Sequence, residues 1–200
     1  SSRDDLVAHV YDVTYGVIKP EDNLVIIDDS IVRGTTLKKS ILKMMDRLSP
    51  KRIVVVSSAP QIRYPDCYGI DMANLEGLVA FKAALALLKD TNNYHIVEDI
   101  YLRSKAQVNL HDSEVENFVK EIYAPFNPQQ ISDKIAELLS EDGIKAEVKI
   151  IFQPIENLHI ACPKNLGDWY FTGNYPTPGG NRVVNRAFIN FFEGNKERAY

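Results

Sequence analysis

Four apolar residues run directly into two adjacent carboxylates in the segment Leu24-Val25-Ile26-Ile27-Asp28-Asp29-Ser30-Ile31-Val32-Arg33-Gly34-Thr35-Thr36. A short, continuous apolar run is typical of a strand that is buried on both faces of a parallel sheet, and it predicts such a strand over Leu24–Ile27. The carboxylates of Asp28 and Asp29 would then lie at the carboxyl end of the strand, where open α/β sheets bind their ligands.

The residues that follow, 30–36, combine small side chains with hydroxyl groups and lead into a helical pattern. Backbone amides at the N-terminus of a helix can converge on an anion, and the hydroxyls of Thr35 and Thr36 add further donors. A ligand that offers hydroxyls to the carboxylates and a phosphate to the loop is a sugar phosphate. An aspartate at a strand end can also simply cap the next helix, and the residues alone leave both alternatives open. The loop is not of the ATP-binding GxxxxGK[ST] type.

The composition is that of an ordinary globular chain of 200 residues, with 45% hydrophobic and 25% charged residues. A net charge of −4 without a basic stripe argues against a nucleic-acid partner. No apolar run is long enough to cross a membrane, and no signal peptide is visible, so we expect a cytoplasmic protein. The two cysteines, Cys67 and Cys162, are far apart in the sequence and are expected to be free thiols.

The apolar spacing predicts a helix over residues 35–48 and a second buried strand over Ile53–Val56, which together form a parallel βαβ unit. The loop that follows the second strand carries one cation, Arg63, for which an anion contact and a structural salt bridge are equally consistent with the sequence. Further helices are expected over 74–88, from Ser113 onward, from Asn127 to Gly143, and up to Gly194; strands are expected over 148–152 and 158–162.

The segment 28–36 resembles the phosphoribosyl-pyrophosphate (PRPP) motif of type I phosphoribosyltransferases, in the version found in the amidophosphoribosyltransferase family. Two further blocks support this resemblance, residues 57–72 and, more weakly, residues 171–177. The resemblance is carried mainly by about the first 90 residues. It implies a partial type I phosphoribosyltransferase fold, α/β with a doubly wound and mostly parallel sheet. The residue patterns beyond this region predict a C-terminal α+β extension. The expected divisions are 1–90 (C-terminal half of the core), 91–165 (insertion or subdomain) and 166–200 (C-terminal loop and helix).

The resemblance also implies an activity: PRPP and glutamine-derived ammonia would give 5-phosphoribosylamine and pyrophosphate in purine synthesis. Mg²⁺ would accompany PRPP at Asp28 and Asp29. The glutaminase would be a separate N-terminal domain, and the parent protein would be a homo-oligomer. The implied PRPP-binding residues are Asp28, Asp29, Ser30, Ile31, Val32, Arg33, Gly34, Thr35 and Thr36.

This chain differs from the family pattern in three respects. Neither cysteine is an N-terminal glutaminase nucleophile, and residues 3–12 lack the usual cations of the loop before the motif. The cysteines that hold an iron–sulphur cluster in some members are replaced by Asp66, Gly167 and Tyr170, so no cluster is expected. Too few residues precede Asp28 for two βα units, so we expect a C-terminal fragment, and we expect that fragment to be inactive alone. The alternative is a non-catalytic domain that senses PRPP or nucleotides in a purine regulator.

Overall fold

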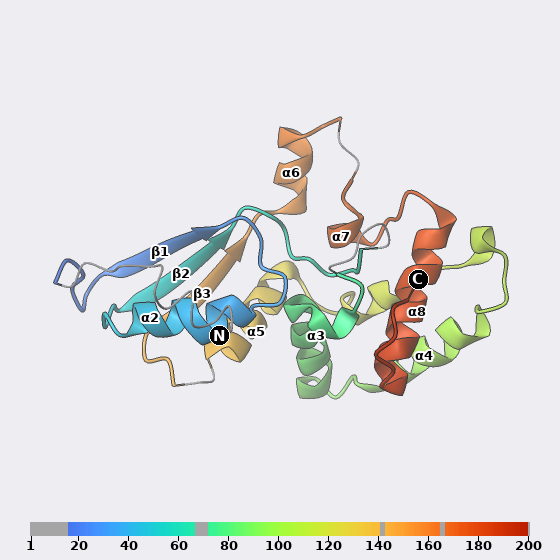
Figure 1. Ribbon diagram of the computed structural model, residues 1–200, viewed down its shortest axis with the longest axis horizontal. Helices are drawn as coiled ribbons and strands as arrows, with labels where there is room; N and C mark the ends of the chain where they lie inside the picture. Colours follow the sequence, from blue (N-terminus) through green and yellow to red (C-terminus); the bar gives the residue numbers. More distant parts are fainter. Residues whose placement is uncertain (1–15, 67–71, 141–142, 165–166, 200) are drawn as a thin grey trace.

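A computed structural model describes residues 16–66, 72–140, 143–164 and 167–199. It confirms the α/β class: three parallel strands form one sheet in the order β1-β2-β3, with helices packed against it (Figure 1). The strands are β1 (Asn23–Asp28), β2 (Arg52–Ser57) and β3 (Glu147–Phe152). The α-helices are α2 (Leu42–Asp46), α3 (Val79–Asp90), α4 (His95–Ala106), α5 (Pro128–Ser140), α6 (Ile155–Ala161), α7 (Trp169–Thr172) and α8 (Pro178–Glu193). A π-helical turn, η1 (Leu37–Ile41), precedes α2, and three 3-10 turns are η2 (Leu75–Gly77), η3 (Asp112–Glu114) and η4 (Phe118–Ile122).

The predicted βαβ unit is confirmed, because β1 and β2 pair in parallel with Leu24 opposite Ile53 and Asp28 opposite Ser57. The third strand comes from far along the chain: β3 pairs in parallel with β2, with Ser57 opposite Phe152. The sheet therefore combines residues from both sides of the division that the sequence suggested near residue 90. All three strands end at the same edge, where their carboxyl ends meet.

The prediction that the first strand is buried on both faces is wrong. Val25 and Ile27 of β1 are 62% and 77% exposed, and Ile151 of β3 is 43% exposed. Ile27 and Ile151 share a row across the sheet through Val56, and successive strand residues point to opposite faces. One face of the sheet is thus packed against the helices, with Ile53, Val55 and Ile150 buried, while the opposite face is open at β1.

The exposure of Ile27 predicts that Ile27→Thr leaves the free energy of unfolding within about 0.5 kcal/mol of the parent value, as for other surface substitutions. Threonine keeps the β-branched shape that suits a strand, so only solvent-facing apolar surface changes. Urea unfolding measures the difference. A loss of several times that size would mean that another part of the molecule covers this face.

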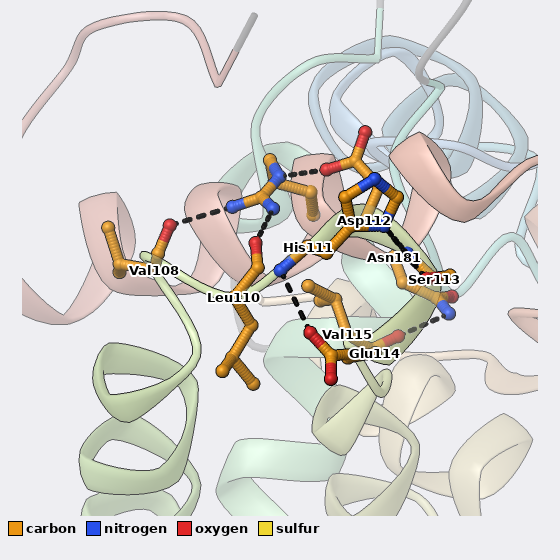
Figure 2. A network of polar contacts seen from close by, with 9 residues as sticks. Val108, Leu110, His111, Asp112, Ser113, Glu114, Val115 and Asn181 are labelled. Carbon is orange, nitrogen blue, oxygen red and sulfur yellow. Dashed lines mark hydrogen bonds and ion pairs between the residues drawn. The ribbon is translucent and has the colours of Figure 1, made fainter.

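Two expected elements in the middle of the chain are corrected. Residues 113–122 form two short 3-10 turns rather than an α-helix, although Val119 and Ile122 are buried as expected. The capping box exists, but His111 occupies the cap: its Nδ1 contacts the Ser113 hydroxyl at 2.8 Å, and its amide donates to Glu114 (Figure 2). Residues 158–162 do not form a strand, because most of them belong to α6.

The helical half of the molecule packs around α8, whose end at Glu193 before Gly194 agrees with the prediction. Phe81 of α3 and Phe188 of α8 are fully buried, and Phe81 meets Phe191 edge-on at 4.9 Å. Arg182 of α8 donates hydrogen bonds to the carbonyls of Val108 and Leu110 and to the carboxylate of Asp112 (Figure 2). These bonds fasten the turn after α4 onto α8.

In the described part of the chain no helix is long and apolar enough to cross a bilayer.

Candidate functional site

The predicted acidic pair lies at the carboxyl end of β1. Asp28 is the last residue of the strand and Asp29 is the next. The backbone carbonyls of these two residues accept hydrogen bonds from the amides of Ser58 and Ala59, at 2.9 and 3.0 Å. The chain after β2 is therefore fixed alongside the pair. The Asp28 carboxylate accepts the Asp29 amide at 3.0 Å, and the Asp29 carboxylate accepts the Ser30 hydroxyl at 3.3 Å. Their remaining oxygen lone pairs can accept further hydrogen bonds from a ligand.

The loop over residues 30–36 is held in place by the packing of its first residues. Its hydrogen-bond donors lie at its end, where the helix begins. Ile31 is buried, and the Val32 carbonyl accepts the amide of Val79 at 2.8 Å. Helical hydrogen bonding starts where the Lys38 amide donates to the Gly34 carbonyl. Among the described residues, no hydrogen bond satisfies the amides of Gly34, Thr35 and Thr36, and both threonines are exposed. Such a helix start is a ready anion site.

Gly34 is required by this geometry. Its φ of +68° lies in the left-handed region, and a Cβ placed there would lie 2.8 Å from Cδ2 of Leu139 on α5. The loop is therefore packed directly onto the buried face of α5. This contact could not be read from the sequence, where the two residues are more than one hundred positions apart.

Arg33 belongs to the predicted set but lines a different part of the surface. It is exposed and borders a cavity of about 460 Å³ together with Lys82 and Arg198. The other predicted loop residues do not line that cavity. The two carboxylates and the loop amides thus lie in one continuous segment after β1, whereas the Arg33 side chain is turned toward α3.

The carboxylate oxygens of the acidic pair are suitable ligands for a magnesium ion that is bound together with a phosphate. Mg²⁺ is commonly held by one or two carboxylates plus substrate phosphates, and Asp28 and Asp29 supply two adjacent carboxylates at an open strand end. Within the described residues, no cluster of three or more His, Cys, Asp or Glu side chains forms a larger protein-only metal site.

Arg63 lies at the carboxyl ends of β2 and β3, beside the start of α5. It lines a cavity of about 580 Å³ whose lining includes Gln61, Pro128 and Phe152 but no residue of the 28–36 segment. The structural salt bridge that the sequence allowed is absent: no carboxylate pairs with Arg63 in the part of the chain that the structure describes. Burial lowers the pKa of its guanidinium, an effect partly opposed by Tyr64 and Tyr123.

The sequence analysis missed the residues that hold Arg63. Gln61 is buried, and its Oε1 accepts from Nε and Nη2 of Arg63 at 3.1 and 2.7 Å. The guanidinium also lies over the ring of Tyr123, 5.3 Å from its centroid, while the Tyr123 hydroxyl donates to the Arg63 carbonyl at 2.6 Å. Gln61 lay within the quoted block 57–72, but nothing local in the sequence pointed to Tyr123.

Two of the blocks that carried the family resemblance meet in space. The amides of Arg63 and Tyr64 both donate to the Tyr170 carbonyl, and the Tyr175 hydroxyl donates to the Pro65 carbonyl at 2.6 Å. The glycine between these tyrosines, Gly173, has a φ of +71°, and a Cβ there would lie 2.8 Å from the ring of Tyr64. The segment 169–175 therefore braces the loop that carries Arg63.

Cys67, residues 68–71 and residues 3–12 lie outside the described residues.

The buried tyrosines predict a loss of stability at alkaline pH. Burial raises the pKa of Tyr64 and that of Tyr123 well above the ordinary value. Each ionises near pH 10 in an unfolded chain, so the free energy of unfolding should be constant below that pH and fall above it by up to about 1.4 kcal/mol per pH unit and tyrosine. Urea unfolding at pH 9 to 11, with tyrosinate absorbance, measures this. Ionisation of both tyrosines near pH 10 in the native protein would contradict the burial.

Comparison with known proteins finds several amidophosphoribosyltransferases that are similar to part of this chain. No family model matches the chain. Amidophosphoribosyltransferases from Haemophilus influenzae and Escherichia coli are 46% and 43% identical over 61 and 60 residues, covering 30% of this chain and 12% of each relative. The Schizosaccharomyces pombe amidophosphoribosyltransferase is 37% identical over 106 residues, covering 50% of this chain and 20% of the relative.

These matches span a fifth or less of each relative's own length. They agree with the family that the motifs at 28–36 and 57–72 suggested. The resemblance inferred from those motifs is therefore confirmed: over the matched part, this chain is similar in sequence to the amidophosphoribosyltransferases.

Proposed function

We propose that this chain carries the PRPP site of an amidophosphoribosyltransferase. The whole protein would form 5-phosphoribosylamine and pyrophosphate from PRPP and ammonia, in purine biosynthesis. The observation that supports this most strongly is the pairing of two open carboxylates with an adjacent loop of unsatisfied amides, at the carboxyl end of a parallel strand. The ammonia would come from glutamine through a glutaminase domain outside the described residues, and the cytoplasm would be the site of the reaction.

In this proposal each part of the site has a separate task. The carboxylates of Asp28 and Asp29 would accept hydrogen bonds from the ribose hydroxyls and fix the orientation of the sugar. The amides of residues 34–36 and the hydroxyls of Thr35 and Thr36 would hold the 5-phosphate. Mg²⁺, when bound at the two carboxylates, would neutralise negative charge on the pyrophosphate group.

The chain's own contribution to catalysis would be positioning and electrostatic stabilisation. Positive charge develops on the ribose ring as the bond to pyrophosphate breaks, and the carboxylates lie on the side where the ribose would bind. Ammonia is itself a nucleophile and does not require a strong base on the protein. This agrees with a site built from acidic side chains and backbone amides.

Calorimetric titration of the chain with PRPP in the presence of Mg²⁺ tests the proposal. We expect saturable binding, and weaker binding of ribose 5-phosphate, which offers the same sugar and phosphate without pyrophosphate. Absence of heat with a folded chain would contradict the proposal. Binding without release of pyrophosphate on addition of ammonium would instead favour a sensing role for this chain.

A further inference from the structure

The cation that lines the cavity, Arg63, makes no ion pair in the part of the chain that the structure describes. The hydrogen bonds of the guanidinium to Gln61 involve only Nε and Nη2, and both go to a single neutral oxygen. Nη1 has no hydrogen-bond partner among the described residues. A partly buried charge with only neutral partners is costly unless an opposite charge completes the site.

The guanidinium is also held in place before any ligand arrives. The Nε2 atom of Gln61 donates to the Pro128 carbonyl at 2.7 Å and to the Ser132 hydroxyl at 2.9 Å, so the amide oxygen is fixed toward Arg63. The Tyr123 ring also packs against the guanidinium. Such preorganisation reduces the entropy that binding would otherwise lose.

The rest of the cavity suits an organic anion. Its volume of about 580 Å³ lies in the range of small-molecule sites. Pro60, Pro128, Phe152 and Pro154 give it apolar walls. The first turn of the 13-residue helix α5 faces it, with the amide of Gln129 unbonded within the described structure. The positive end of the helix dipole therefore adds to the charge of Arg63.

We infer that the Arg63 cavity is a binding site for a small organic oxyanion, a phosphate or carboxylate carried on an apolar body, distinct from the 28–36 loop. The oxyanion would accept hydrogen bonds from Nη1 of Arg63, and the body would pack against Pro128 and Phe152. Glu156, an exposed carboxylate on α6, also borders the cavity and opposes the anion. This inference does not depend on PRPP binding at the loop.

Residue-specific NMR of the isotopically labelled chain tests the site with phenyl phosphate, benzoate and inorganic phosphate at constant ionic strength. We expect phenyl phosphate and benzoate to shift the Arg63 Nε–H and Gln129 amide signals saturably, and inorganic phosphate to do so more weakly because it lacks the apolar body. Arg63→Gln should weaken phenyl phosphate binding at least about tenfold, the loss of a charge-assisted hydrogen bond. The matched control Arg52→Gln removes a cation that is already paired with Glu147 and should change nothing.

A second variant keeps the test decisive if Arg63→Gln does not fold. Glu156→Gln removes an exposed carboxylate from the cavity rim, and it should tighten phenyl phosphate binding about two- to threefold. Shifts confined to the amides of residues 30–36 would support the loop as an anion site and overturn this inference. The inference would also be overturned if the Gln129 amide signal shifted equally in the parent and in Arg63→Gln. The same holds if no probe shifted the signals of Arg63 and Gln129.

Discussion

Binding of PRPP in the presence of Mg²⁺ is expected to weaken at least about a hundredfold in the double variant Asp28→Asn/Asp29→Asn. A hydrogen bond to a charged group contributes about 1.5–3 kcal/mol, and two carboxylates are lost. The two asparagines keep the size of the side chains and the oxygen that accepts the Asp29 amide, so the fold should survive. Calorimetric titration of the parent and the variant measures the change directly.

A matched control separates this effect from a simple change in net charge. Glu21→Gln/Asp133→Asn also removes two carboxylates, from exposed positions outside the 28–36 segment. It should bind PRPP as the parent does. If both double variants lose affinity equally, the acidic pair has no special role, and the proposed function loses its main support.

The second large effect concerns the loop itself. Gly34→Ala is expected to lower the free energy of unfolding by roughly 2–4 kcal/mol, because it combines a left-handed backbone conformation with overpacking against Leu139. Urea unfolding measures the loss. The same variant should weaken PRPP binding, since the amides at residues 34–36 would no longer hold their positions.

Gly143 offers a close control for that experiment. Its φ of +82° is also left-handed, but a Cβ there would meet nothing within 4 Å. Gly143→Ala should therefore lower the free energy of unfolding only by the cost of a left-handed backbone conformation, about 1–2 kcal/mol. If Gly34→Ala costs no more than Gly143→Ala, the loop does not pack on α5 as described.

Leu139→Ala combined with Gly34→Ala should be less destabilising than the sum of the single changes, because the shortened side chain on α5 leaves room for the new methyl group.

The sequence predicted those parts of the fold that depend on local patterns. The apolar runs located β1 and β2, and the spacing of Ile131, Ile135 and Leu139 located α5. The acidic pair and the loop were found because their residue types stand side by side in the chain. These features need no knowledge of which elements pack together.

Contacts between distant segments could not be predicted in this way. An apolar run such as Leu24–Ile27 looks the same at the edge of a sheet as at its centre, so the exposure of Val25 and Ile27 was missed. The capping box expected at Ser113 is formed instead by His111 and Glu114, and 3-10 turns take the place of the expected helix. The helix α3 begins only at Val79 rather than at residue 74, because the 3-10 turn η2 occupies Leu75–Gly77. The support of Arg63 by Gln61 and Tyr123 depends on residues that no local pattern connects.

The open face of the sheet at Val25 and Ile27 has a consequence for the behaviour of this chain in concentrated solution. Apolar surface on an edge strand attracts other molecules, and the backbone groups along its outer side can extend a sheet from one molecule to the next. A net charge of only −4 supplies little repulsion between molecules, and added salt screens what there is. Within the described residues, β1 is therefore one place where isolated chains can associate, and mutually repelling charges placed along it are a direct way to improve colloidal stability.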